Sequence, residues 1–289
     1  GSPISTAIVN TRELLQGYVG LDLATGPTST APQRWLRLGR QTMDVGSRRL
    51  VARNRFRNTV NAFTGARARW DLENGVGLQA FYVLPTQRLP DDAESLLENE
   101  AQFDQESWNL RFWGGVVDAP IDDRGSRLEL FAFGLREEDS AQRETRDRRL
   151  VTPGFRLRRA PAVGAWDFTV ESSIQWGTSS PRSALDADLE HFAHQQHIEV
   201  GYTLRDPAKT RLLLQFDHVS GDGDPTDQRN GRFDSLWGAR RFDYGPTGIY
   251  GPFTCNNLIS PGFRLFTHPT PNLQIMFSHR FYWSDSGRD

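Results

Sequence analysis

Residues 166–176 read WDFTVESSIQW and alternate strictly between two kinds of side chain. One parity is apolar and consists of Trp166, Phe168, Val170, Ile174 and Trp176. The other parity is polar and consists of Asp167, Thr169, Glu171, Ser173 and Gln175. Successive side chains of a strand point to opposite faces, so the segment predicts a strand with one apolar and one polar face. Such a strand suits either a soluble sheet packed on a core or an outer-membrane barrel, whose apolar face contacts lipid.

The composition of the chain excludes some classes of protein and leaves the barrel open. The 289 residues are 37% hydrophobic, and the mean hydropathy is −0.57. No run approaches the ~20 apolar residues of a transmembrane helix, whereas barrel strands are apolar only at alternate positions. The net charge of −2 and a pI near 6.4 give no indication of a nucleic-acid partner. The single cysteine, Cys255, excludes an internal disulfide framework.

The alternating pattern recurs along the chain and predicts about twelve strands. They lie near 14–24, 33–43, 62–72, 75–88, 105–118, 126–138, 149–160, 163–178, 191–205, 209–220, 259–267 and 271–283. Many of these segments reach ten residues, whereas a usual globular strand has about five or six. One short helix is expected near 94–103.

The connections between the predicted strands alternate in length. Short turns are expected near 73–75, 160–163, 206–208 and 268–271. Long polar connections are expected near 44–61, 89–104, 139–148, 179–190 and 221–258. Outer-membrane barrels have short periplasmic turns and long surface loops, whereas a Greek-key sandwich lacks this regular alternation. We therefore predict an all-β fold, a transmembrane antiparallel up-and-down β-barrel in the bacterial outer membrane. Residues 1–289 would form one such domain, incomplete at both ends, with long surface loops near 44–61, 89–104, 179–190 and 221–258.

The polar faces of the predicted strands are rich in arginine, and all but one of the 34 basic residues are arginines. The candidate pore-lining residues from this pattern are Arg67, Arg69, Arg111, Arg156, Arg158, Arg205, Arg211 and Arg280. Positive side chains around a pore select for anions. The alternative is a network of paired charges that only rigidifies the protein.

Other chemical motifs are weak. SGDGDPTD (220–227) places Asp222, Asp224 and Asp227 in a Gly-rich turn, which could hold Ca²⁺ in a surface loop. The alternative is a solvated loop, because the spacing is not that of an EF-hand. No nucleophile elbow, P-loop or zinc-protease motif is present, so we expect neither an enzyme nor any other cofactor.

Three stretches carry a family resemblance. LRLGRQTMDVGSRRLVARNRFRNTVNAFTGARARW (36–70) and HVSGDGDPTDQRNGRFDSLWGARRFDYGPTGIYGPFTCNNLISPGFRL (218–265) resemble segments of the alginate-export family of bacterial outer-membrane barrels. LLQGYVGLDL (14–23) is similar to the strand that precedes the first segment. The resemblance implies a barrel of about 18 strands, of which this chain forms the middle part, with a positively charged pore for an anionic polyuronate. It also implies pore roles for Arg40, in the Gly-Arg-Gln motif, and for Arg48 and Arg49 in the loop after it.

The sequence therefore predicts an outer-membrane channel for passive passage of an anionic solute, alginate or another uronate-containing saccharide. Its expected partners are the lipid bilayer, the saccharide and periplasmic export machinery. Two alternatives stay open: a general anion-preferring diffusion porin, and a soluble sugar-binding β-sandwich protein. Detergent separates them, because only the soluble protein should stay monodisperse without it.

Overall fold

The protein is built on one antiparallel sheet. The structure, a computed structural model, describes residues 5–6, 8–23, 32–54, 59–140, 143–182, 188–239, 244 and 253–287. The sheet has 13 strands, and twelve of them follow one another in sequence order. They are β1 (Gly17–Asp22), β2 (Arg34–Gln41), β3 (Phe63–Asp71), β4 (Gly77–Pro85), β5 (Leu110–Pro120), β6 (Ser126–Glu137), β7 (Arg149–Arg159), β8 (Trp166–Ser179), β9 (Leu189–Thr203), β10 (Arg211–Val219), β12 (Leu258–Thr270) and β13 (Leu273–Arg280). All twelve strands expected from the alternating pattern are present.

Two small elements complete the described part of the chain. The short strand β11 (Arg229–Asn230) pairs in parallel with β9. The helix α1 (Ala93–Leu97) begins at Asp92, whose side chain accepts a hydrogen bond from the backbone of Ser95. No helix in the described part of the chain has the length and apolar composition of a membrane span.

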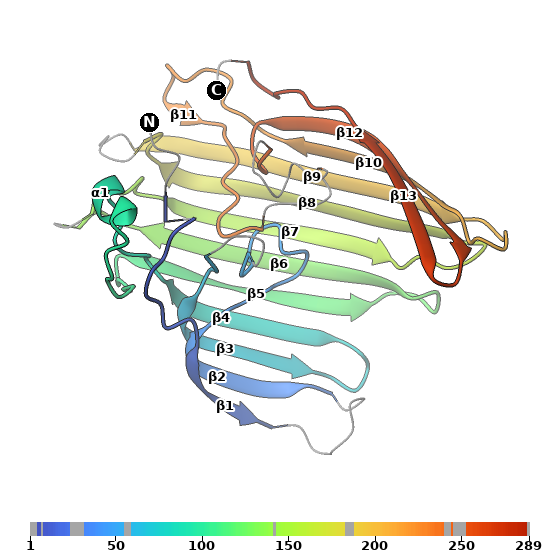
Figure 1. Cartoon of the computed structure of the whole chain (residues 1–289), viewed down its shortest axis with the longest axis horizontal. Coiled ribbons are helices and arrows are strands. Elements are labelled where there is room, and N and C mark those ends of the chain that lie inside the picture. Colours follow the sequence, from blue (N-terminus) through green and yellow to red (C-terminus); the bar gives the residue numbers. More distant parts are fainter. Residues whose placement is uncertain are drawn as a thin grey trace.

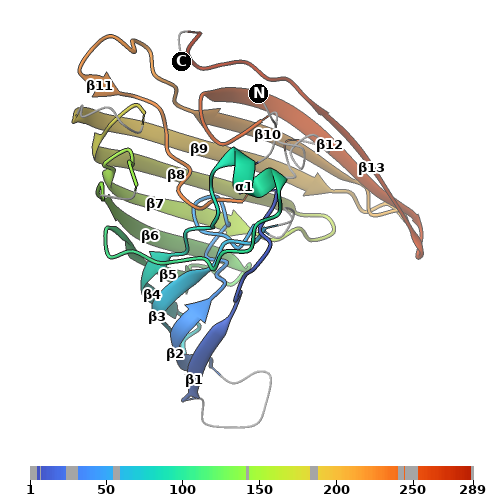
Figure 2. The ribbon, with the colours of Figure 1, turned by 60° about the vertical axis from the view of Figure 1, so that its left-hand side comes forward.

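The sheet is curved and open (Figures 1 and 2). Each strand on the main path is antiparallel to its neighbours, which is the up-and-down order expected from the sequence. In the described residues, β1 pairs only with β2 and β13 pairs only with β12, so the two edge strands do not close the sheet. The connections after β3, β5, β7, β9 and β12 are short and lie at one end of the strands, whereas those after β2, β4, β6, β8 and β10 are longer and lie at the other end.

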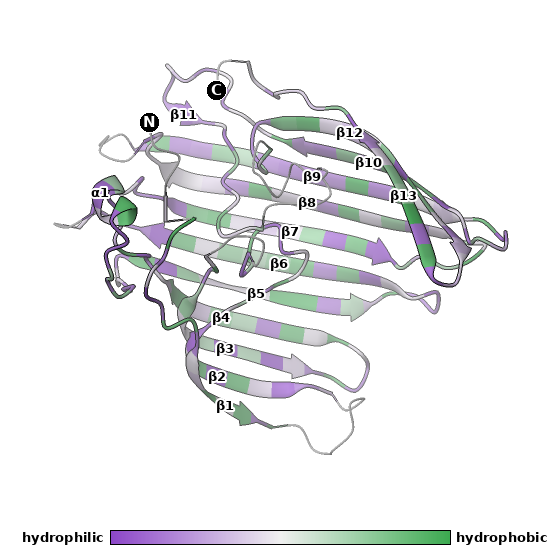
Figure 3. Ribbon diagram, viewed as in Figure 1, coloured by the Kyte–Doolittle hydropathy of each residue, from purple (hydrophilic) through white to green (hydrophobic). Residues whose placement is uncertain are grey.

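Apolar side chains of the sheet are exposed and polar ones are buried, the reverse of the arrangement in a soluble protein. On β8, the side chains of Trp166 and Trp176 are 62% and 44% exposed, whereas those of Asp167 and Glu171 are 1% and 2% exposed. β9 and β10 repeat the pattern, and Figure 3 shows apolar and polar residues alternating along the strands. Apolar surface on this scale is rare on a soluble monomer and is the normal outer surface of a membrane barrel.

No second sheet covers this apolar face among the described residues, since all 13 strands belong to one sheet. The expected sandwich alternative requires two stacked sheets with apolar inner faces. The soluble β-sandwich is therefore not the fold of this chain.

Two long connections fold onto the concave face rather than away from the sheet (Figure 1). Val51 pairs with Val45 in its own connection and with Trp237 in the connection before β12. The backbone of Ala52 donates to the carbonyl of Trp237 at 3.0 Å. The ring of Trp237 packs on Phe112 of β5, with the ring centroids 4.7 Å apart. The described parts of the loops expected at the surface near 44–61 and 221–258 thus include residues buried inside the curve of the sheet.

Candidate functional site

A cavity of about 230 Å³ lies in the concave wall, beneath the first of these inward connections. Its charged lining comes from five strands and one loop: Arg49, Arg156, Glu171, His197, Glu199, Arg211 and Arg264. Alternate residues of adjacent antiparallel strands project to the same side, which is why distant positions in the sequence converge here. The strand register sets Arg156 directly opposite Glu171, and Glu171 directly opposite His197.

One buried carboxylate contacts two of the residues that line the cavity. Asp217 on β10 is 0% exposed, and Arg49 from the inward connection is 1% exposed. The Oδ1 atom of Asp217 lies 3.3 Å from Nη1 of Arg49 and 2.8 Å from Nδ1 of His197. Its Oδ2 atom lies 2.5 Å from Nη2 of Arg280. Buried charges are tolerated mainly when they are paired, so this cluster pins the inward connection to the wall.

A second contact reinforces this attachment. Ser47 Oγ donates a hydrogen bond of 2.7 Å to Oε1 of Glu171, and Arg49 lies 3.7 Å from the other oxygen of the same carboxylate. The inward connection is therefore held to β8 and β10 together.

Several other arginines of the concave face are also paired with carboxylates. Arg156 contacts Glu129 at 2.8 Å, and Arg211 contacts Asp167 at 2.5 Å. Further pairs join Arg158 to Asp118 at 3.3 Å and Arg69 to Asp71 at 3.0 Å. These pairs lower the net positive charge that arginine count alone would suggest.

Some of the expected pore-lining residues lie elsewhere. Arg111 does not line the concave face, because it alternates with Phe112, which packs there on Trp237. It contacts Glu138 at 3.3 Å on the outward side that it shares with Trp113. Arg40 has the parity of the exposed Leu38 and contacts Glu106 at 2.5 Å.

Two more of the expected pore residues lie outside the strands. Arg205 is exposed in the short turn after β9. Arg48 lies in the inward connection beside Arg49, with a positive φ of 65°.

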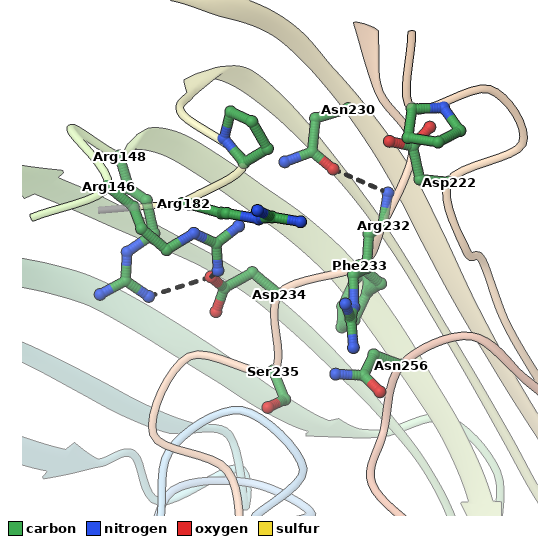
Figure 4. Close-up of a pocket in the computed structure, with 12 residues that line it drawn as sticks. Arg146, Arg148, Arg182, Asp222, Asn230, Arg232, Phe233, Asp234, Ser235 and Asn256 are labelled. Carbon is green, nitrogen blue, oxygen red and sulfur yellow. Dashed lines mark hydrogen bonds and ion pairs between the residues drawn. The ribbon is translucent and has the colours of Figure 1, made fainter. Parts of the chain in front are cut away.

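A second basic cavity, larger than the first, is not predicted by the sequence. It has a volume of about 600 Å³ and lies among the long connections, where its lining includes Arg146, Arg148, Arg182, Arg232 and Asp234 (Figure 4). Asp234 contacts Arg148 at 2.9 Å and Arg146 at 3.7 Å. The run RETRDRR (143–149) was the available signal, but it lies in a connection without periodicity.

The arginines of this cavity control the ionisation of Asp234. Burial alone would raise the pKa of this carboxyl, but Arg148 and a backbone hydrogen bond from Leu236 bring the pKa below its ordinary value. Burial likewise opposes the charge of Arg148, yet Asp234 and Glu137 raise the pKa of its guanidinium. Both groups are charged at neutral pH, and they hold the second inward connection against the start of β7.

The predicted calcium ligands lie in the loop after β10. Thr226 donates to Asp224, through both its backbone and its hydroxyl, and the backbone of Arg229 donates to Asp227. Within the described ranges, no group of three or more His, Cys, Asp or Glu side chains is arranged to hold a metal ion. Calcium binding at Asp222, Asp224 and Asp227 stays a prediction.

The exposed apolar face of the sheet and the basic cavities agree with the result of comparing the chain with known families. The family described as alginate export matches residues 5–289. The chain belongs to the alginate export family. No individual curated protein is significantly similar to it. The alginate export family is one of outer-membrane channels, so membership supports transport across the outer membrane and not catalysis.

Proposed function

We propose that the protein is a passive outer-membrane channel for an anionic saccharide, alginate or a related uronate polymer, which passes along the concave face. The observation that carries the proposal is the pair of basic cavities, one in the concave wall and one among the long connections. The cavity at the long connections has four arginines and two aspartates in its lining. The cavity in the wall has four arginines and two glutamates.

Pairing of these arginines suits passage better than tight binding. A guanidinium that already contacts one carboxylate keeps further N–H donors, because its fork carries five. Conduction requires each contact to be strong enough to admit the solute and weak enough to release it. Partly neutralised arginines give contacts of this intermediate strength.

Block of ion current by uronate oligomers tests the proposed solute. We expect a tri-uronate to reduce single-channel current reversibly at concentrations where its methyl ester, which lacks the charge, does not. Equal block by acid and ester would show that carboxylates are not recognised.

The extensive pairing of the arginines also favours a second candidate, a general anion-preferring porin. In that case the channel would prefer chloride to potassium but would show no block by the tri-uronate. The same recording therefore separates the two candidates.

A further inference from the structure

Arg37 on β2 and Arg67 on β3 lie directly opposite each other in the antiparallel register. Arg67 has the parity of Phe63, whose ring packs against Trp237 on the concave side. Side chains in such directly opposite positions have Cβ atoms about 4.5–5.5 Å apart, and like charges there are destabilising. Two arginine side chains of like charge therefore lie next to each other on the concave wall.

One aromatic side chain contacts both of these arginines. The Cζ atoms of Arg37 and Arg67 lie 4.5 Å and 5.3 Å from the ring centroid of Trp35. Arg37 also lies 5.2 Å from the ring centroid of Tyr18 on β1. Stacking on aromatic rings occupies the face of a guanidinium and leaves its in-plane N–H donors for a carboxylate. The rings therefore hold both forks in place without neutralising them.

Two nearby carboxylates of the described chain contact other arginines. The carboxylate of Asp44 contacts Arg53 at 3.0 Å, and that of Asp71 contacts Arg69 at 3.0 Å. Among the described residues, Arg67 donates only to the backbone carbonyl of Asp44 and to the amide oxygen of Gln79, each at 3.3 Å. Arg67 is only 9% exposed, and its buried Nε atom has no hydrogen-bond partner in the described part of the chain.

We propose that Arg37 and Arg67, oriented by Trp35, form a subsite that binds one carboxylate of the passing saccharide. The subsite rests on the proposed function only for the identity of that saccharide. An anion between the two guanidiniums would relieve their mutual repulsion and supply the hydrogen bonds that Arg67 lacks. The site lies on β2 and β3, outside both of the cavities described above.

Equilibrium binding to the detergent-solubilised protein tests the subsite independently of conduction. Calorimetric titration with a tri-uronate and with its methyl ester measures the contribution of the carboxylate. We expect Arg37→Gln and Arg67→Gln each to weaken binding of the acid about tenfold, because each removes a charged hydrogen bond. Arg37→Lys, which keeps the charge and loses the planar fork, should also weaken binding.

The matched control is Arg124→Gln, an arginine exposed in the short turn after β5. It should leave binding unchanged. Arg37→Gln should also unfold at the same temperature as the wild type or higher in the absence of ligand, because it removes a like-charge pair. A merely structural arginine would instead lower the unfolding temperature when replaced.

Two results would overturn the subsite: binding of the acid by Arg37→Gln and Arg67→Gln within twofold of wild type, or equal affinity of the wild type for acid and ester. The first result, in a channel that still prefers anions, leaves the proposed function intact. The opposite combination is also informative. If both glutamine variants lose binding but the channel does not prefer anions, the subsite stands and the proposed transport of an anion is wrong.

Discussion

Asp217 joins three parts of the chain inside the curve of the sheet. Its carboxylate contacts Arg49, His197 and Arg280, which come from the inward connection, β9 and β13. Asp217→Asn would leave two arginines buried without that negative charge, and breaking a buried pair in this way costs about 3–5 kcal/mol. We expect a clear fall in the midpoint of denaturant unfolding in detergent.

The control for this substitution is Asp123→Asn, at an exposed position in the turn after β5. It should leave the midpoint unchanged. A midpoint for Asp217→Asn equal to that of the control would mean that the cluster does not stabilise the fold.

The acid limb of stability should depend on Asp234. The pKa of this carboxyl is below its ordinary value in the folded protein, so its contribution is complete above the unfolded pKa of about 3.9. The contribution is lost as the pH falls through the lower, folded value. Asp234→Asn should therefore flatten the decline of the unfolding temperature as the pH falls below about 5. A decline as steep as that of wild type would assign acid lability to other carboxylates.

At the scale of elements, the two inward connections narrow the concave face. Trp237 joins them to the wall through its backbone pairing with Val51 and its ring contacts with Phe63 and Phe112. Trp237→Ala should release the connection and raise single-channel conductance. Trp108→Ala is the control, since that tryptophan is 69% exposed. Conductance that stays at the wild-type value in Trp237→Ala would show that this connection does not obstruct the path.

The strands could be predicted from the sequence because their alternation is local. WDFTVESSIQW already separates the buried Glu171 from the exposed Trp166. The inward connections could not be predicted, because the pairing of Val51 with Trp237 joins distant positions and leaves no periodic signal. Arg111 was misplaced because both of the residues that follow it, Phe112 and Trp113, are aromatic, so polarity alone did not fix the face.

At the scale of the whole molecule, the apolar convex face should contact lipid. Trp166 and Trp176 are the most direct reporters, since both are exposed on the same face of β8. Brominated acyl chains should quench the tryptophan fluorescence of the wild type. The quenching should be smaller in Trp166→Phe and in Trp176→Phe, because each variant lacks one of the lipid-facing tryptophans. Full fluorescence of the wild type in brominated lipid would place this face away from the bilayer.

The concave face should then surround an aqueous path with a preference for anions. The reversal potential across a planar bilayer with a potassium chloride gradient measures this preference directly. We predict a reversal potential on the chloride side of zero. Arg156→Gln, in the concave wall, should reduce it. Arg111→Gln should leave it unchanged, because Arg111 also contacts a glutamate but lies on the outward side. A potential on the potassium side, or an equal change in both variants, would contradict an anion path along the concave face.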